Sequence, residues 1–155
     1  MDPTPDRPDV VIFPPVIPAS ALVVILLLHW LWPLDILLRP LTFALGATLC
    51  ALGIGCAAWG RIMLVRAGTN VSPLKPTTAI VTEGSFRFTR NPLYVGGTTL
   101  LLGVSLLIGT WWGVIVLLPA NLILHYGVVL REERYLEQKF GESYIKFKNS
   151  VRRYL

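Results

Sequence analysis

Residues 91–130 read NPLYVGGTTLLLGVSLLIGTWWGVIVLLPANLILHYGVVL, a run of 40 residues without a charged side chain. A helix rises about 1.5 Å per residue, so about 20 residues cross the apolar core of a bilayer. The run is therefore about twice as long as one crossing requires, and Gly109-Thr110-Trp111-Trp112-Gly113 interrupts it near the middle. We predict two spanning helices, at about 92–108 and 112–130, joined by a tight turn with interfacial tryptophans.

Two more uncharged segments precede this run. Pro40–Gly60 carries no charge over 21 residues, and we predict a span at about 41–65. Val10–Leu34 is also uncharged, but its three prolines up to position 18 delay the helix. We therefore predict the first span at about 19–34.

The composition supports a membrane protein and argues against other classes. The 155 residues are 54% hydrophobic and 15% charged, whereas a soluble domain carries about 25% charged residues. The same composition excludes disorder, and the length allows one domain, 1–155. The net charge is +5, but the basic residues border the apolar segments, so we expect no nucleic-acid partner. Cys50 and Cys56 lie within an apolar stretch and are expected to be small packing residues.

The distribution of Lys and Arg predicts the orientation. With the N-terminus inside, twelve of the fourteen basic residues lie in the N-terminus, the loop 66–91 and the tail from Arg131; the exceptions are Arg39, outside, and Arg61, at a helix end. We expect an all-α integral protein of a bacterial inner membrane, with four transmembrane helices and with the loop and the C-terminus in the cytoplasm. Residues 1–9 are acidic and proline-rich, so we expect no cleavable signal peptide.

The tail is predicted to form two helices on the cytoplasmic side, over 131–155. Residues 131–140 continue the fourth span as a charged helix, Gly141 ends it, and the second, amphipathic helix begins near Glu142. Its residues Tyr144, Phe147, Val151 and Tyr154 fall at helical spacing on one face, so we expect this helix to lie along the lipid headgroups. For the loop segment 77–88, a strand and a short helix both fit.

Small residues in the second and third spans predict close approach of neighbouring helices. They are Gly46, Gly53, Ala57 and Gly60 in the second span, and Gly96, Gly97 and Gly103 in the third.

The first polar cluster on the cytoplasmic side runs from Gly84 to Gly96. Pro92 suits the first turn of the third span, and Asn91 suits its N-cap. Because a helix N-terminus attracts anions and Arg90 adds a positive charge, a carboxylate or phosphate would suit this place. The alternative is that Arg90 only meets lipid phosphates.

The second cluster is the pair Glu132-Glu133, directly after the fourth span. Neighbours on a helix differ by about 100°, so one carboxylate can turn inward while the other faces solvent. An inward glutamate would accept hydrogen bonds from a diol or an amine. The alternative is an ion-pair network along the helix that includes Lys139.

Two polar residues lie within the fourth span. Asn121 and His125 are four residues apart and share a helix face. Polar groups at this depth are functional candidates, and a hydrogen bond to a neighbouring helix is the alternative. No set of His, Cys, Asp or Glu has metal-ligand spacing, so no metal is expected.

Together the two clusters resemble the integral membrane methyltransferases of the isoprenylcysteine carboxyl methyltransferase and phospholipid N-methyltransferase type. The signature of that family, Arg-His/Asn-Pro-x-Tyr-x-Gly, is matched by Arg90-Asn91-Pro92-Leu93-Tyr94-Val95-Gly96. Glu132-Glu133, Phe140-Gly141, Tyr144 and Val151-Arg152-Arg153 then follow in the order of the family. The resemblance covers residues 77–155, half of the chain.

The resemblance implies S-adenosylmethionine as methyl donor, held between the loop, the last two spans and the tail. It implies a lipophilic small molecule or lipid as acceptor, with a carboxylate, as in isoprenylcysteine, or an amine as the accepting group. Membrane lipid is the other expected partner. The residues implied to hold the donor are Thr78, Ala79, Ile80, Val81, Phe86, Asn91, Pro92, Leu93, Tyr94 and Glu132.

Three residues are expected to act in catalysis: Arg90, His125 and Glu133. For an amine acceptor, His125 or Glu133 would take the proton, whereas a carboxylate acceptor needs no general base. Asn91 stands where the family often has histidine, and it keeps the capacity for hydrogen bonding there.

A second class of function also explains part of the sequence. A non-catalytic four-helix membrane scaffold or transport subunit, with a basic lipid-binding tail, would account for the hydrophobicity, the topology and the C-terminal helix. It leaves the inward glutamate and the Arg90–Gly96 motif without a purpose. A relative that keeps the pocket but has lost activity would have the same sequence features.

Overall fold

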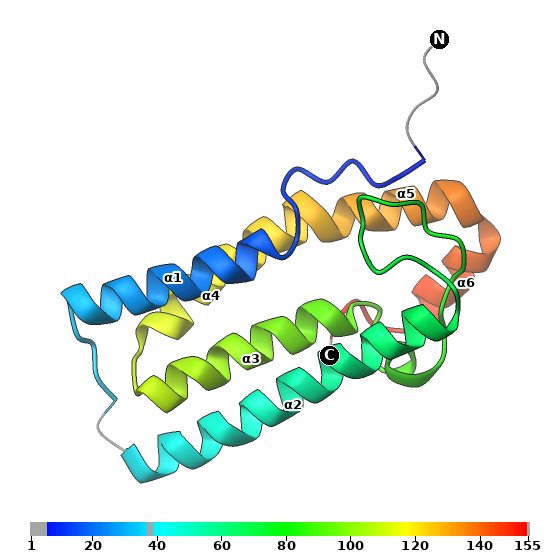
Figure 1. Cartoon of the computed structure of the whole chain (residues 1–155). Coiled ribbons are helices and arrows are strands. Elements are labelled where there is room, and N and C mark those ends of the chain that lie inside the picture. Colours follow the sequence, from blue (N-terminus) through cyan, green and yellow to red (C-terminus); the bar gives the residue numbers. More distant parts are fainter. Residues whose placement is uncertain (1–5, 37–38, 155) are drawn as a thin grey trace.

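The computed structural model describes residues 6–36 and 39–154, and these residues form a bundle of helices (Figure 1). The apolar helices are α1 (Val16–Leu31), α2 (Arg39–Arg66), α3 (Pro92–Ile108) and α4 (Trp112–Leu124). A π-helical segment, η2 (His125–Val129), leads directly into the charged helix α5 (Leu130–Phe140), which α6 (Glu142–Ser150) follows. Only one isolated β-bridge, Asp35–Thr110, occurs among the described residues, which confirms the all-α class. Of the predicted domain 1–155, residues 1–5, 37–38 and 155 lie outside the described residues.

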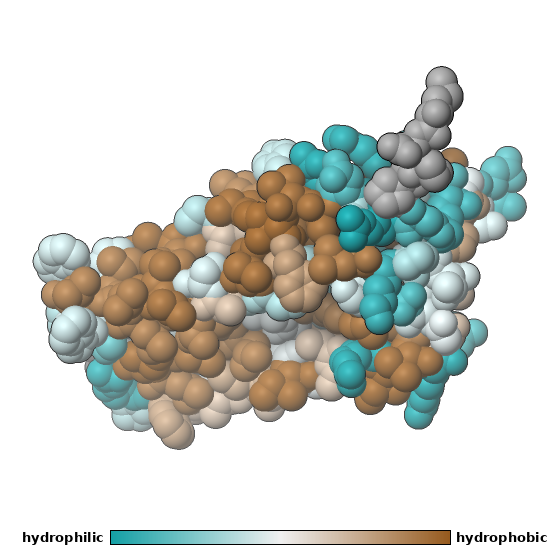
Figure 2. Space-filling model, turned by 45° about the horizontal axis from the view of Figure 1, so that its top comes forward, coloured by the Kyte–Doolittle hydropathy of each residue, from teal (hydrophilic) through white to brown (hydrophobic). Residues whose placement is uncertain are grey.

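Two of the helices are long and apolar enough to cross a membrane. They are α2 and the continuous helix from Trp112 to Phe140, which joins α4, η2 and α5. The helices α1 and α3 are apolar but shorter. Figure 2 shows hydrophobic side chains over the left and centre of the molecule, and hydrophilic ones gathered at the right end, where α5 and α6 lie.

The first helix differs from the predicted 19–34 by three residues at each end, because it covers Val16–Leu31. Pro18 lies within its first turn, where backbone N–H groups have no partner inside a helix, so this proline removes no hydrogen bond. Pro33 disfavours helical backbone at Trp32, and the helix ends before it. The bounds of α2 and α3, and the start of α4, agree with the prediction to within two residues.

The most extensive packing between two helices joins α2 and α3, which run antiparallel (Figure 1). A Cβ atom added to Gly53 would lie 2.6 Å from the backbone nitrogen of Leu100, and one added to Gly96 would lie 2.6 Å from the carbonyl oxygen of Gly53. Gly46, Gly60 and Gly103 are packed as tightly, which confirms the close approach expected of these glycines. At Gly97, an added Cβ would meet nothing within 4 Å, so that expectation was wrong for this residue.

The turns after α1 and after α3 meet at one end of the bundle. Trp111 donates its backbone N–H to Leu34 at 2.9 Å, and the indole of Trp112 donates to the carbonyl oxygen of Trp32 at 2.7 Å. Gly109, with φ +78°, ends α3 in the left-handed region that favours glycine. The charged helices α5 and α6 lie at the opposite end (Figure 1).

The loop between α2 and α3 contains one short helix. Residues Gly84–Arg87 form the 3₁₀ helix η1, and residues 77–82 have no regular structure. Of the two predicted alternatives for 77–88, the short helix is present and the strand is absent.

The helix α6 is shorter and more buried than predicted. It ends at Ser150, and Val151 has extended backbone, so the predicted helical face does not reach Tyr154. Tyr144 and Phe147 are only 3% and 7% exposed because they pack against Phe86 of the loop. The expectation that this apolar face lies along headgroups was therefore wrong, since the protein itself covers it.

Candidate functional site

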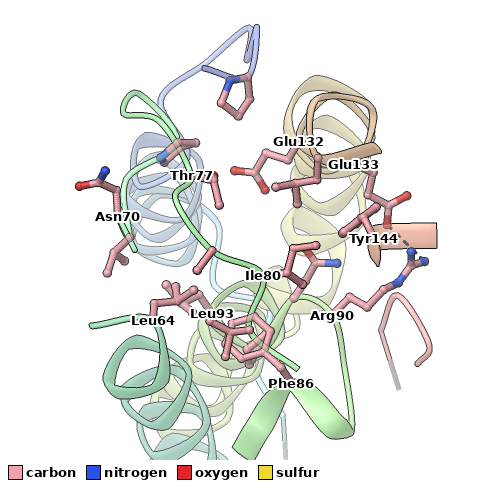
Figure 3. A pocket seen from close by; sticks show the side chains of 18 of the residues that line it. Leu64, Asn70, Thr77, Ile80, Phe86, Arg90, Leu93, Glu132, Glu133 and Tyr144 are labelled. Atoms are coloured by element: carbon pink, nitrogen blue, oxygen red, sulfur yellow. Dashed lines mark ion pairs between the residues drawn. The ribbon is translucent and has the colours of Figure 1, made fainter. Parts of the chain in front are cut away.

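A cavity of about 140 Å³ lies at the end of the bundle that carries the charged helices. Its walls come from the start of α3, from α5 and α6, and from the loop 70–81. In Figure 3, Leu64, Phe86 and Leu93 lie across the cavity from Glu132. Predicted residues that line it are Ala79, Ile80, Val81, Phe86, Arg90, Asn91, Pro92, Leu93, Tyr94, Glu132 and Glu133.

Glu132 and Tyr94 meet at this cavity. The hydroxyl of Tyr94 on α3 donates a hydrogen bond of 2.8 Å to Oε1 of Glu132 on α5. The bond fixes one carboxylate oxygen, so the other oxygen remains able to accept hydrogen bonds from a bound group. Two sequence segments separated by 38 residues thus form one polar wall.

Glu133 is also held inside the protein, although one of the two glutamates was expected to face solvent. It is 5% exposed, and Arg153 donates to both of its oxygens, from Nε at 2.9 Å and from Nη2 at 2.8 Å. Arg90 also approaches it, with Nη2 3.2 Å from Oε1 (Figure 3). Glu133 can be buried because Arg153 of the C-terminal tail covers it, whereas Glu132 lines the cavity and is half-buried. The alternative network with Lys139 was wrong, since Lys139 pairs with Asp6.

The side chain of Arg90 is buried and has unused hydrogen-bond donors. Its side chain is 7% exposed, and its Nε and Nη1 atoms hydrogen-bond no partner among the described residues. Burying an unpaired donor is costly unless something accepts from it. Because Arg90 lines the cavity, these N–H groups suit an anionic or carbonyl oxygen of a ligand.

The C-terminal tail positions the start of α3. Arg153 accepts hydrogen bonds at its backbone oxygen from the Thr89 hydroxyl and from the Asn91 amide, each at 3.0 Å, and the backbone N–H of Arg90 donates to the carbonyl oxygen of Arg152. Asn91 occupies the N-cap position, but its side-chain oxygen makes no capping bond, and its amide nitrogen donates to the tail. Pro92 is in the first turn of α3, as predicted.

Burial and charge shift the pKa values of two groups around Glu133. Burial, and then the negative charge of Glu133, raise the pKa of Tyr144 to about 12. The hydrogen bond to Glu133 raises the pKa of Arg153 above its ordinary value. Tyr144 is therefore a neutral phenol at neutral pH, and Arg153 is a permanent cation.

The π-helical segment η2 alters the helix directly before the two glutamates. One turn of π-helix adds a residue to the local turn, and such turns are frequent at functional sites. His125, its first residue, has Nδ1 2.9 Å from the hydroxyl of Tyr154. His125 is not among the cavity-lining residues, so its role as a proton acceptor stays a prediction.

Thr78 is the other predicted site residue outside the cavity lining. Its hydroxyl donates to the carbonyl oxygen of Gly68 at 3.0 Å, and this bond links two parts of the loop between α2 and α3. Residues that line the cavity but were not predicted are Pro8, Leu64, Asn70, Val71, Ser72, Pro73, Thr77, Leu136, Tyr144 and Phe147. Leu136 could have been found, because it lies four residues after Glu132 on the same face of α5.

An N-terminal strap, residues 6–11, covers part of the cavity. The carboxylate of Asp6 accepts from Lys139 Nζ at 2.7 Å and from the Tyr135 hydroxyl at 2.8 Å. Tyr135 also accepts from the backbone N–H of Thr77 at 3.2 Å, so one side chain of α5 holds both the strap and the loop. Pro8 of the strap is buried and lines the cavity.

A second, larger hollow adjoins the cavity. This apolar groove has a volume of about 660 Å³ and lies between the start of α1 and the helices α2, α3 and α4. It shares Leu93, Tyr94 and the loop residues 71–73 with the cavity. Gly97 lines it, which explains why a Cβ at this glycine would meet no neighbour.

The fold and the site define a helical protein with apolar helices of membrane-crossing length and a polar cavity beside an apolar groove. The phospholipid methyltransferase family model matches residues 41–143, more than half of the chain, and the chain belongs to this family. The predicted resemblance is thereby confirmed, and membership implies methyltransferase activity. The chain is also similar to an uncharacterised protein of Haemophilus influenzae, with 46% identity over 57 residues, which are 37% of this chain and 81% of the relative.

Proposed function

We propose that this protein transfers a methyl group from S-adenosylmethionine to a lipid-like acceptor. The observation that carries the proposal is the convergence of Tyr94, Glu132 and the donor-rich Arg90 on one cavity that adjoins an apolar groove. The donor supplies an activated methyl group on a sulfonium, so the protein mainly needs to align the acceptor and exclude water.

The cavity residues fit the donor chemically. Glu132 suits the ribose hydroxyls or the ammonium group, and the unpartnered Nε and Nη1 of Arg90 suit the carboxylate. Ile80, Phe86 and Phe147 provide an apolar wall for the base and keep water out. Ligand pockets usually measure about 300–1,000 Å³, and the cavity measures about 140 Å³. We therefore propose that the N-terminal strap and the loop 70–77 move when the donor binds.

The apolar groove suits the tail of the acceptor. Tyr94 and Leu93 line both the groove and the cavity, so an acceptor in the groove would present its polar head beside the donor. Both oxygens of Glu133 are engaged by arginines, and His125 does not line the cavity. This arrangement favours an acceptor that needs no general base, such as a carboxylate, over an amine.

The same residues suggest the placement in the membrane. We propose that α1 to α4, the last extended by η2, all cross the membrane, with the cavity on the cytoplasmic side, since most Lys and Arg residues lie in the segments at that end. Residues 66–91 and the C-terminal tail would then face the cytoplasm of a bacterial cell.

Titration calorimetry with S-adenosylhomocysteine tests the donor. Purified protein in detergent should release heat on binding, and Glu132→Ala should abolish it. Glu137→Ala is the matched control, because Glu137 lies on the same helix, pairs with Lys148 and does not line the cavity. Absence of heat from the wild-type protein at millimolar ligand would favour the non-catalytic scaffold instead.

The acceptor is tested separately by methyl incorporation. Lipid extracts incubated with the protein and radiolabelled S-adenosylmethionine should yield a labelled lipophilic product. A base-labile label identifies a methyl ester, and a base-stable label on nitrogen identifies an amine acceptor. Gly97→Leu should prevent labelling and keep the calorimetric heat, because the new side chain projects into the groove.

A further inference from the structure

One hydrogen-bonded pair lies inside the apolar groove. Thr98 of α3 donates its hydroxyl proton to Oδ1 of Asn121 on α4 at 2.8 Å, and both side chains line the groove. The amide nitrogen of Asn121 donates to the carbonyl oxygen of Leu117, one turn earlier on α4, at 2.8 Å.

This pair keeps hydrogen-bonding capacity for a third group. An asparagine amide nitrogen carries two hydrogens, and the bond to Leu117 uses one of them. The oxygen of Thr98 keeps its lone pairs after donating to Asn121. The groove wall therefore offers one donor and one acceptor among side chains that are otherwise mostly apolar. A ligand chain without polar atoms would leave both this donor and this acceptor without a partner.

The position of the pair relative to Tyr94 sets a distance. Thr98 is four residues after Tyr94, so the two share a face of α3 and differ by about 6 Å in depth. Tyr94 lines both the cavity and the groove and thus marks where the acceptor head meets the donor. The groove continues past the pair to Leu101 and Leu117.

We infer that Thr98 and Asn121 select an acceptor whose chain carries a hydrogen-bonding oxygen, such as a carbonyl, ether or hydroxyl, about 6 Å from the group that is methylated. The inference rests on the proposed function, because it places the acceptor in the groove. A site built to bond an oxygen discriminates against the analogue that lacks it, since the polar groups of the site then stay unpaired.

Binding of matched probes to the purified protein in detergent tests this inference. The probes are a twelve-carbon carboxylic acid and the same acid with a ketone carbonyl five carbons from the carboxylate, together with the two corresponding amines. In at least one series the wild type should bind the ketone roughly fivefold more tightly than the plain probe. Gly97→Leu should weaken binding of both probes if they occupy the groove.

Variants distinguish a pair that selects the acceptor from a pair that only joins α3 to α4. The double variant Thr98→Val, Asn121→Leu should lose the preference for the ketone, while Thr99→Val, at the next position and outside the groove lining, should keep it. Unfolding temperatures verify that the variants are folded, and the single variant Thr98→Val should show a reduced preference if the double variant unfolds.

Three results would overturn the inference: no preference in the wild type, a preference that survives in the double variant, or binding that Gly97→Leu does not weaken. Calorimetric heat with S-adenosylhomocysteine distinguishes a failure of this inference from a failure of the proposed function. If the heat remains and depends on Glu132, only the inference about the acceptor fails. If the heat is absent, the proposed methyl transfer fails.

Discussion

Gly96 and Gly97 are neighbours on α3 with opposite surroundings. A Cβ atom on Gly96 would lie 2.6 Å from the carbonyl oxygen of Gly53, whereas one on Gly97 would meet nothing within 4 Å. Gly96 therefore allows α3 to approach the backbone of α2, and Gly97 leaves space in the groove. Gly96 thus serves the packing of α3 on α2, and Gly97 keeps the groove open.

Alanine substitutions should distinguish these two roles. Gly96→Ala should lower the free energy of unfolding by about 1–3 kcal/mol or more, because backbone must move to relieve the overlap. Gly97→Ala should be neutral or stabilising by up to about 1 kcal/mol, since alanine is the better helix former. Thermal unfolding in detergent measures both, and equal destabilisation by the two variants would contradict the close packing at Gly96 and the open space at Gly97.

Tyr94→Phe should weaken binding of S-adenosylhomocysteine roughly two- to tenfold, because the carboxylate of Glu132 loses the hydrogen bond that positions it. The substitution removes only the hydroxyl that holds Oε1 of Glu132, and the ring keeps its place between cavity and groove. Tyr126→Phe is the matched control, because Tyr126 is 65% exposed. Unchanged affinity in Tyr94→Phe would mean that Glu132 needs no positioning.

Glu133→Gln should destabilise the fold by about 3–5 kcal/mol, because it removes the counter-charge of a buried arginine. Arg90 would then be buried without a carboxylate, and Arg153 would lose its paired hydrogen bonds. Glu137→Gln breaks a more exposed pair with Lys148 and should cost about 0–1 kcal/mol. Chemical or thermal unfolding compares the two variants. Similar losses in the free energy of unfolding would show that the buried network contributes no more stability than the exposed pair.

The N-terminal strap should open at high salt. A cysteine introduced by Pro8→Cys, with Cys50 and Cys56 replaced by alanine, should react slowly with a thiol reagent, because position 8 is buried. Asp6→Asn should speed the reaction. Because Asp9 of the strap also pairs with Arg131, added salt should speed the reaction in the wild-type strap but not in the double variant Asp6→Asn, Asp9→Asn. If the labelling rate depended neither on salt nor on Asp6, the strap would not be held by charge.

The strap should not respond to mild acid. Hydrogen bonds from Lys139 and Tyr135 lower the pKa of Asp6 below its ordinary value of 3.8. A lowered pKa means that the contact is fully present above 3.8 and is lost only as the pH falls through the lower value. The rate of labelling at position 8, divided by that of an exposed reference cysteine such as Glu83→Cys to correct for the pH dependence of the thiolate, should therefore be equal at pH 7 and pH 5. A large increase at pH 5 would assign the control of the strap to another group.

The orientation can be tested with the same chemistry. In the background without native cysteines, Glu83→Cys should react with an impermeant reagent only when the cytoplasmic side is accessible, because Glu83 is exposed at the cavity end. Trp111→Cys, at the opposite end, should react in intact cells. Labelling of Glu83→Cys in intact cells would reverse the proposed topology.

Much of the fold follows from local properties of the chain. The length of an apolar segment and the residues of a turn are local features of the sequence. The apolar helices, the turn at 109–113 and the helix break at Gly141 therefore agree with prediction. One error is local, and the other lies where distant segments meet. Pro18 was expected to delay α1, although the first turn tolerates it, and α6 was extended to a face that the loop around Phe86 covers.

For the site, the sequence alone determined which residue types are present in the two motifs and that both lie at the end of an apolar helix. Only the tertiary structure decided that Glu133 is buried and Glu132 lines the cavity, that Arg90 and Arg153 share Glu133, and that Thr98 and Asn121 face one groove. The physical reason is that helix formation depends on neighbours along the chain, whereas the partner of a buried charge and the shape of a hollow depend on segments that fold back from far away.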